Sequence, residues 1–541
     1  MIRDVSKLKT GPFDVVIIGG GIYGSWMALY SALSGLKVAL VEKSDWGSAT
    51  SSSSSKLLHG GLRYLERYEF GLVRKSLQER KELNRLLPHQ VRPLRFLLPV
   101  YRDSRVGKLQ LKAGLWLYDL LAGRNQPVGR RQSFSAAQLV QQEPALSSDN
   151  LVAGFSYGDC GTDDFRMVLE VVDTAMQNGV TACHYMTATE LLKAAGRATG
   201  VRLNDRLTGE TFDVHASIVI NAAGPWVFQQ FGLGEEPQNA CRVRLTKGVH
   251  LVMPPLSSNN AVLLTAKSDG RVFFLIPWYG RTLLGTTDTD YSGNPADVRV
   301  ESQDINYLLD AANGYLKTRW SRTEVHGAYV GLRTLQNEAD QSASGVSREW
   351  SFEETIPGLM TSLGGKYTSA RIDATSAVNH ILTKLNRRTR RTWSELKMAW
   401  SPNEKFATWM QNVCRKAVAQ GMDEHSAETC ARRHGANTEH LLQLVAIRPE
   451  LAERIVPDLP FCKAELVYAA ASENAVSLVD ILRRRVPLML LTQLNVQLLQ
   501  KIGELVSPEF GWDDPECSHQ VNQALARSAR WKIWPIATNP D

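Results

Sequence analysis

The first forty residues of the chain alternate between short apolar runs and glycine-rich sequence. An apolar, β-branched run over residues 14–18 leads directly into glycines, and a stretch of helical character continues to Ser34. A second apolar run over residues 35–42 ends in an acidic residue. Short apolar runs bounded by turn residues are typical of buried strands, so this pattern predicts strand, turn, helix and strand in that order.

Three glycines, Gly19, Gly21 and Gly24, follow the first predicted strand with the spacing G-x-G-x-x-G. Gly19 permits a tight turn, Gly21 lets the backbone approach a pyrophosphate, and Gly24 allows the helix to pack closely on the strand. The N–H groups at the start of the helix can bind the phosphates. Glu42 is then placed to accept a hydrogen bond from a ribose hydroxyl. The motif predicts a bound dinucleotide, and its N-terminal position ahead of a serine-rich loop favours FAD over NAD.

Two later segments support a flavin. A predicted buried strand at residues 216–221 is followed by small residues, including Gly224, where the backbone can pass close to a cofactor. Near the end of the same region, Gly364 and Gly365 precede a predicted helix. They are placed to present N–H groups, together with Lys366, to the electron-rich edge of a reduced flavin.

The bulk composition is that of a folded protein with two or three domains. The chain has 541 residues, of which 43% are hydrophobic and 22% are charged. Its 7 cysteines are scattered, without a C-x-x-C pair, so we expect neither a disulfide framework nor a metal site. The N-terminus has no signal-peptide pattern, and no apolar stretch is long enough to span a membrane. These features predict a cytoplasmic protein that is soluble or peripherally attached to a membrane.

Positive charge is concentrated in one part of the chain. The net charge is +7, and residues 84–131 contain ten basic residues against two acidic ones. Within this region, residues 108–121 have a helical pattern whose broad apolar face consists of Leu109, Ala113, Trp116 and Leu120. Such a helix can lie in a membrane interface with its lysines on anionic headgroups. We prefer this interpretation, and hence a quinone as electron acceptor, to the alternative of a buried core helix.

The most specific pattern is the segment A-T-S-S-S-S-S-K-L-L-H-G-G-L-R-Y-L-E at residues 49–66. It resembles, almost letter for letter, the signature of the membrane-associated, flavin-linked glycerol-3-phosphate dehydrogenases. The resemblance extends over roughly residues 12–375 and includes the segments 68–70, 157–166, 221–226, 247–250, 276–278, 285–288, 331–333 and 364–366. The chain departs from the family pattern at Tyr23 and Trp26, where smaller residues are usual, and at Thr334 and Ser472.

The resemblance implies an α/β fold with three parts. Residues 12–385 are expected to form a Rossmann-like, doubly wound FAD-binding domain, interleaved with a substrate domain built on a mixed, mostly antiparallel sheet. Residues 393–541 are expected to form a C-terminal helical cap. FAD is the implied cofactor, and the residues predicted to bind it are Gly19, Gly21, Gly24, Glu42, Thr50, Ser54, Ser55, Gly60, Gly61, Gly224, Gly364 and Gly365.

The family oxidises sn-glycerol-3-phosphate to dihydroxyacetone phosphate by hydride transfer to FAD, and its substrate is a small dianion. The residues predicted to bind this substrate are Arg63, Tyr64, Thr286 and Arg348. The predicted catalytic residues are His250, Arg333 and Lys366. Histidine suits the base that removes the alcohol proton, with His59 as the competitor for this role. Arg333 or Lys366 would stabilise the developing alkoxide.

The partners implied are sn-glycerol-3-phosphate, a quinone and the cytoplasmic face of the inner membrane, to which the protein would bind peripherally. A homodimer is left open. One alternative is a flavin oxidase or dehydrogenase of the same fold that acts on an amino acid or a 2-hydroxy acid. A second alternative is a basic module without catalytic activity. Nucleic acid is not expected as a partner, because aromatic residues suited to base stacking are not interleaved with the basic residues.

Overall fold

The strands predicted near the N-terminus lie at the centre of the first of two sheets. The structure is a computed structural model that describes residues 1–124, 126–231, 243–336, 349–388, 393 and 396–531. β1 (Phe13–Ile18) pairs in parallel with β2 (Val38–Glu42) on one side and with β10 (Thr211–Asn221) on the other. The sheet also contains β7 (Thr181–His184), β8 (Met186–Ala194), β9 (Arg197–Asp205), β17 (Trp350–Ile356) and β18 (Leu359–Gly364). The predicted strand–turn–helix–strand unit is confirmed.

Alternate residues of β1 pack against different layers. Val15 and Ile17 are buried with side chains of α1 (Ile22–Leu33), α5 (Asp164–Gln177) and α8 (Ala370–Lys384) on one face of the sheet. Val16 and Ile18 are buried on the opposite face with side chains of β8 and β9. This period of two is the expected result for a strand that is covered on both faces.

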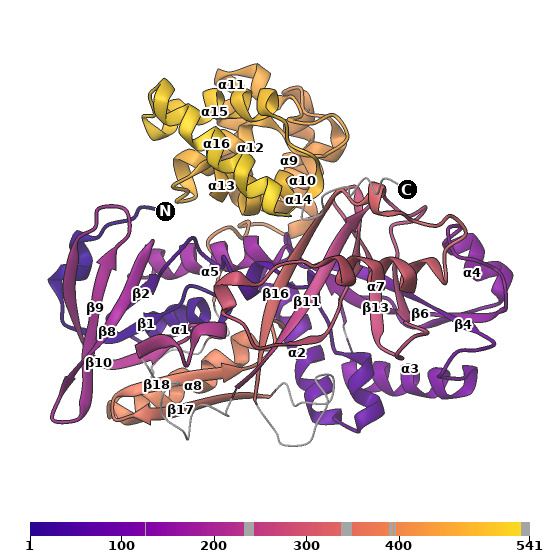
Figure 1. The fold of residues 1–541 in the computed structure, drawn as a ribbon, viewed down its shortest axis with the longest axis horizontal. Helices are drawn as coiled ribbons and strands as arrows, with labels where there is room; N and C mark the ends of the chain where they lie inside the picture. Colours follow the sequence, from indigo (N-terminus) through magenta and orange to yellow (C-terminus); the bar gives the residue numbers. More distant parts are fainter. Residues whose placement is uncertain (125, 232–242, 337–348, 389–392, 394–395, 532–541) are drawn as a thin grey trace, which may run out of the picture.

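The second sheet lies beside the first and is mostly antiparallel (Figure 1). Its long strand β11 (Val243–Met253) pairs with β16 (Gly327–Gln336), which places Thr246 opposite Arg333 and His250 opposite Tyr329. One parallel pairing, between β4 and β12, makes the sheet mixed, as predicted. The other strands are β3 (Leu57–Leu58), β4 (Arg92–Tyr101), β5 (Gln132–Phe134), β6 (Leu151–Gly161), β12 (Ala261–Thr265), β13 (Val272–Trp278), β14 (Arg281–Gly285) and β15 (Thr289–Tyr291).

Among the described residues before the C-terminal part, four helices lie around the second sheet, and a short 3-10 helix, η3 (Leu62–Arg67), carries part of the serine-loop signature. α2 and α3 lie below the sheet in the view of Figure 1, on the side away from the cap. The four helices are α2 (Phe70–Leu86), α3 (Lys108–Ala122), α4 (Ala136–Gln142) and α7 (Ser302–Asn313). The helix predicted at residues 108–121 is therefore present as α3.

The C-terminal part is helical, as predicted, and sits on top of both sheets in Figure 1, coloured orange to yellow. Its helices are α9 (Phe406–Ala419), α10 (Glu424–His434), α11 (Thr438–Ile447), α12 (Lys463–Ser472), α13 (Leu478–Asp480), α14 (Leu488–Leu491), α15 (Val496–Phe510) and α16 (Asp514–Trp531). We refer to this part as the cap.

Buried ion pairs join the cap to the cofactor-binding region. Arg166 of α5 contacts Glu473 at 2.7 Å, and Arg485 contacts Asp45 at 2.8 Å, with all four side chains buried. Although burial acts in the opposite direction, the positive charge of Arg166 holds the pKa of Glu473 well below its usual range. Removing one partner of such a pair leaves an uncompensated buried charge, which costs about 3–5 kcal/mol. These pairs therefore stabilise the contact between the cap and the rest of the protein.

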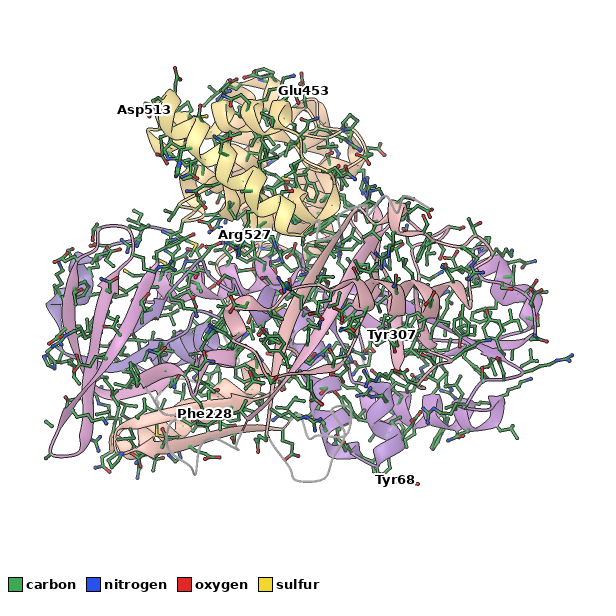
Figure 2. The ribbon with its side chains drawn as sticks, viewed as in Figure 1. Tyr68, Phe228, Tyr307, Glu453, Asp513 and Arg527 are labelled. Carbon is green, nitrogen blue, oxygen red and sulfur yellow. The ribbon has the colours of Figure 1, made fainter. Side chains whose placement is uncertain are left out.

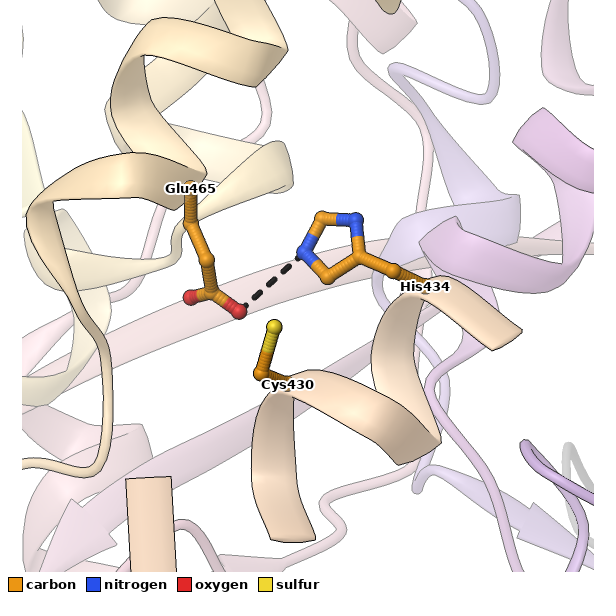
Figure 3. Close-up of side chains that lie close together, drawn as sticks. All are labelled: Cys430, His434 and Glu465. Carbon is orange, nitrogen blue, oxygen red and sulfur yellow. Dashed lines mark hydrogen bonds and ion pairs between the residues drawn. The ribbon is translucent and has the colours of Figure 1, made fainter. Parts of the chain in front are cut away.

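Cys430 and His434 of α10 lie close to Glu465 of α12, with ligand-type atoms within 4.8 Å of one another (Figure 3). The His434 ring is hydrogen-bonded on both sides, since Nδ1 lies 3.0 Å from Arg166 Nη2 and Nε2 lies 3.1 Å from Glu465 Oε1. An arginine nitrogen can only donate, so Nδ1 accepts and Nε2 donates to the carboxylate. Neither ring nitrogen then offers a lone pair to a metal. We interpret the group as part of the network that joins the cap to α5.

Candidate active site

A cavity of about 380 Å³ is lined by residues of both sheets. It opens at the carboxyl ends of β1, β2, β10 and β18, which contribute Ile18, Glu42, Ala222 and Gly364. Ligands of parallel α/β sheets bind at this edge. From the second sheet, β11 and β16 contribute His250 and Arg333. The site therefore combines a dinucleotide-type edge with polar side chains from an antiparallel sheet.

The glycine loop and Glu42 lie at one end of the cavity. The two carboxylate oxygens of Glu42 accept hydrogen bonds from the backbone N–H groups of Gly20 at 2.8 Å and Ser44 at 2.9 Å. Burial raises the pKa of Glu42, and these two donors oppose the rise. Because a carboxylate oxygen can accept more than one hydrogen bond, Glu42 keeps acceptor capacity for a ribose hydroxyl.

The hydroxyls of the serine loop have protein partners. Thr50 donates to the carbonyl oxygen of Leu332 at 2.7 Å, and Ser54 donates to Asp164 at 2.7 Å. Ser55 Oγ lies 2.9 Å from Nε2 of His250. These bonds tie the loop to β16, α5 and β11, so the loop is a built wall of the cavity and not a flexible linker.

Two of the glycines predicted to contact the cofactor do not line the cavity. A Cβ at Gly24 would overlap the carbonyl oxygen of Gly19, which is the close helix–strand packing that the motif predicts. Gly60 is covered by Leu77 and by Tyr118, whose hydroxyl accepts the Gly60 N–H at 2.9 Å. Both positions require glycine because other parts of the protein fill the space.

Gly61, Gly224, Gly364 and Gly365 do line the cavity, and all four have positive φ. At Gly224 a Cβ would meet no protein atom within 4 Å, so it would project into open space. Positive φ favours glycine at all four positions. At Gly224 the open space also lets a ligand approach the backbone closely.

His250 is buried beside the cavity. Its ring stacks on Tyr329 with centroids 4.8 Å apart, and Gly285 packs against its edge. Nδ1 has no hydrogen-bond partner among the described residues. Burial, followed by the positive charges of Arg333 and Lys56, lowers the pKa of His250 well below its usual range. The imidazole is therefore neutral at neutral pH, the form that can accept a proton.

Arg333 lines the same cavity as His250 and is held by polar groups of the β14–β15 connection. Its Nη2 donates to Thr286 Oγ1 at 3.0 Å, and its Nη1 lies 3.1 Å from Asp288 Oδ1. The guanidinium also fills the space above Gly248, where a Cβ would overlap it. The geometry thus presents a fixed, partly exposed guanidinium to the cavity.

Lys366, Arg63, Tyr64 and His59 also line the cavity. The ammonium of Lys366 lies 3.6 Å from the centroid of the Tyr64 ring, which fixes both side chains by a cation–π contact. The predicted substrate ligand Arg348 lies outside the described residues. All other predicted substrate and catalytic residues are thus brought to one cavity.

Sequence reasoning did not single out several residues of this wall. Ser51 Oγ accepts the Ile22 N–H at 2.9 Å at the start of α1. The ammonium of Lys43 lies 3.4 Å from the centroid of the Trp226 ring, and both residues line the cavity near Glu42. Asp288 was passed over although it ends the segment 285–288. Lys43 could have been predicted to lie at the site because it directly follows Glu42 in the sequence. Nothing in the sequence indicates its contact with Trp226.

Comparisons with known proteins agree with this geometry. Residues 14–371 match the family described as "FAD dependent oxidoreductase", and residues 384–517 match the "C-terminal domain of alpha-glycerophosphate oxidase". "Glycerol-3-phosphate dehydrogenase 2" of Mycobacterium tuberculosis is 34% identical over 96% of this chain and 89% of its own length. "Aerobic glycerol-3-phosphate dehydrogenase" of Bacillus subtilis is 32% identical over 95% of this chain and 94% of its own length. The structure of the glycerol-3-phosphate dehydrogenase from Bacillus halodurans complexed with FAD has a TM-score of 0.78 and 28% identity, covering 98% of both chains.

Proposed function

Because this chain belongs to the FAD-dependent oxidoreductases, in the family of the glycerol-3-phosphate dehydrogenases, we propose that its cavity oxidises sn-glycerol-3-phosphate to dihydroxyacetone phosphate. One observation carries the assignment to this substrate. A neutral buried histidine, a fixed arginine and a lysine meet in the same cavity as the glycine loop. This set supplies a base and two cations for a phosphorylated alcohol.

The residues present fit FAD. Gly21 lines the cavity, Gly224 leaves space that a side chain would fill, and Glu42 keeps acceptor capacity beside the glycine loop. The Gly19–Gly24 loop, Glu42 and the wall around Gly224 would hold the cofactor. When bound, FAD supplies the acceptor for the hydride that leaves the substrate carbon.

The chain's own residues prepare the alcohol for oxidation. The neutral ring of His250 accepts the hydroxyl proton, while Ser55 and the stacked Tyr329 keep the ring in place. Arg333 and Lys366 bind the phosphate of the substrate. Asp288 and Thr286 keep the Arg333 fork in one orientation.

An amino acid or a 2-hydroxy acid is a less fitting substrate. A single arginine usually binds a carboxylate, whereas this cavity is lined by Arg63, Arg333 and Lys366. Rates of dye-linked oxidation measured with sn-glycerol-3-phosphate, glycerol, a 2-hydroxy acid and a panel of amino acids distinguish the two. We expect the phosphate ester to be oxidised far faster than every other compound, and preferential turnover of an amino acid would reject the proposal.

A Gly21→Ala substitution is expected to weaken FAD binding by about tenfold or more, because Gly21 lines the cavity and a Cβ there would lie 3.0 Å from Ser51 Oγ, which accepts the Ile22 N–H at the start of α1. Gly21 has φ of −79°, so alanine introduces no backbone strain there. The test is titration of FAD into apoprotein, followed by fluorescence. Gly314→Ala, which adds a methyl group in ordinary contact at the end of α7, is the matched control. Equal FAD affinity in both variants would contradict the assignment of the cofactor site.

We propose that the protein binds the cytoplasmic face of the inner membrane through α3 and passes electrons to a quinone. Among the described residues, no helix is long and apolar enough to cross a membrane. α3 nevertheless exposes Leu109 by 82%, Trp116 by 55% and Leu120 by 60%. Tyr68, which follows η3, and Phe70, the first residue of α2, are also exposed, and Figure 2 shows Tyr68 projecting from the side opposite the cap. We call these five residues the α3 face.

Basic residues flank the α3 face, as an anionic membrane surface requires. Arg102, Lys108 and Lys112 are all exposed. Leu115 and Tyr118 are buried on the opposite side of α3, which explains how the helix is attached to the protein. An apolar cluster lies between α3 and the cavity. It includes Leu62 and Leu65 of η3, and Phe274, which lines the cavity. An apolar acceptor is expected to approach from this side.

A Leu109→Glu, Trp116→Glu double variant is expected to lose about tenfold or more in affinity for vesicles of anionic phospholipid, because two exposed apolar anchors are replaced by acids. Dye-linked activity in solution should persist, since neither residue lines the cavity. The measurement is co-sedimentation with vesicles. Ile447→Glu with Leu207→Glu, at exposed apolar positions elsewhere, is the matched control. Equal binding by both double variants would reject the α3 face as the attachment site.

A further inference from the structure

Tyr23 is a departure from the family pattern that lies in the cavity wall. It is the second residue of α1, and its ring stacks on Trp350 with centroids 6.2 Å apart. The side chain extends from the glycine-loop end of the cavity to the segment that carries Lys366. At Gly365 there is no room for a Cβ, because the Tyr23 hydroxyl occupies that space.

The Tyr23 hydroxyl lies between the Asp373 carboxylate and the backbone of Lys366, whose carbonyl oxygen is 3.2 Å away. It accepts the backbone N–H of Lys366 at 3.0 Å and donates to Asp373 Oδ2 at 2.8 Å. Burial, followed by the charge of Asp373, raises the pKa of Tyr23 well above its usual range, so the phenol keeps its proton. The Lys366 N–H is therefore bound by the protein itself.

Asp373 connects this hydroxyl to two further elements. Its Oδ2 also accepts from Ser369 Oγ at 2.8 Å, and its Oδ1 lies 2.6 Å from the ammonium of Lys75 in α2. Asp373 is itself buried, in the first turn of α8. The turn between β18 and α8 is thus fastened to α1 through Tyr23 and to α2 through Lys75.

The turn needs such a fastening because of its own sequence. Gly364 and Gly365 have φ of +70° and +94°, and glycine restricts the backbone less than any other residue. Lys366 follows these glycines directly, so any movement of the turn moves its ammonium. A hydrogen bond to the Lys366 N–H from a residue on a rigid helix removes that freedom.

We propose that Tyr23 is a positioning residue, which holds the backbone of Lys366 so that its ammonium stands at a fixed place in the cavity. The proposal rests on the proposed function, in which Lys366 binds the phosphate of the substrate. Tyr23 acts through Lys366 and not on the substrate. It also accounts for a bulky residue at a position where smaller ones are usual.

The test compares Tyr23→Phe with Tyr30→Phe in the FAD-loaded protein. Each variant removes one hydroxyl of α1. The Tyr23 hydroxyl contacts the turn before α8, and the Tyr30 hydroxyl accepts a hydrogen bond from Arg371 of α8 at 2.9 Å. Hydrogen exchange of the Lys366 amide is expected to accelerate about tenfold in Tyr23→Phe only. KM for sn-glycerol-3-phosphate should rise about 5- to 20-fold with kcat nearly unchanged, again in Tyr23→Phe only.

Combination with Lys366→Ala separates positioning from a general structural role. If Tyr23 acts through Lys366, the Tyr23→Phe change should alter KM less than about twofold in the Lys366→Ala background. If the two substitutions instead change KM independently, so that their effects multiply in the double variant, the proposal is overturned. Equal changes in the Tyr23 and Tyr30 variants would also overturn it.

If Tyr23→Phe does not fold, Asp373→Asn should change amide exchange and KM in the same direction. Unchanged exchange and KM in Asp373→Asn would also overturn the proposal. Failure of the wild-type protein to oxidise the phosphate ester would reject the proposed function, whereas the exchange measurement would still decide whether Tyr23 holds the turn.

Discussion

Replacement of His250 by asparagine is expected to lower kcat for sn-glycerol-3-phosphate by about 100- to 10 000-fold, the usual contribution of a general base. Asparagine keeps a polar side chain of similar length but cannot accept the alcohol proton. Because Arg333 and Lys366 remain in place, KM should change much less than kcat. Stopped-flow measurement of flavin reduction gives the rate of the chemical step directly.

The pH dependence provides a second readout of the same base. Since burial and neighbouring positive charges lower the pKa of His250, the base is unprotonated above that lowered value. In the wild type, kcat/KM should therefore be level through neutral pH and fall only below about pH 6.5, the usual pKa of histidine. This fall should be absent in His250→Asn. A full loss of activity in His59→Asn, with His250→Asn still active, would assign the base to His59.

Replacement of Arg333 by lysine is expected to lower kcat/KM for sn-glycerol-3-phosphate by roughly 30- to 1000-fold. Lysine keeps the positive charge but loses the two-pronged geometry that suits phosphate oxygens. It also loses the simultaneous contacts with Thr286 and Asp288 that orient the arginine. A desolvated, bidentate contact of this kind contributes on the order of 2 to 4 kcal/mol, which sets the expected range.

Glycerol and a second arginine provide the controls. The loss should nearly vanish for glycerol, a very poor substrate that has no phosphate to bind. Arg244→Lys changes an arginine of β11 that makes a two-pronged contact with Asp290 outside the cavity, and it should leave kcat/KM unchanged. An equal fall for glycerol would mean that Arg333 serves the chemistry or the fold. Unchanged activity toward the phosphate ester would place the phosphate site elsewhere.

Features encoded within a few residues were predictable from sequence. The β1–α1–β2 unit follows from one apolar run, one glycine spacing and a second apolar run. The apolar stripe of α3 likewise predicted the helix and its exposed face, including Leu109, Trp116 and Leu120. Periodicity could not show that Leu115 and Tyr118 anchor the same helix, because their burial depends on η3, α2 and the second sheet.

Contacts between residues far apart in the chain had no local signal. The hydroxyl of Tyr23 meets the backbone of Lys366 across 343 positions, and Arg166 meets Glu473 across 307. Gly60 was expected at the cofactor because it lies in the signature segment, yet its N–H is bound by Tyr118 of α3. A motif shows which residue types occur together. The elements that pack over the motif decide whether each of its residues faces the cavity or the protein interior.

The most direct test of the proposed function is the visible absorption spectrum of the purified protein before and after anaerobic addition of sn-glycerol-3-phosphate, with no electron acceptor present. The account predicts a flavin spectrum that bleaches rapidly with sn-glycerol-3-phosphate, remains unchanged with glycerol at the same concentration, and yields one dihydroxyacetone phosphate for each flavin reduced. A flavin that stays oxidised with sn-glycerol-3-phosphate, or that is bleached instead by an amino acid or a 2-hydroxy acid, would contradict it.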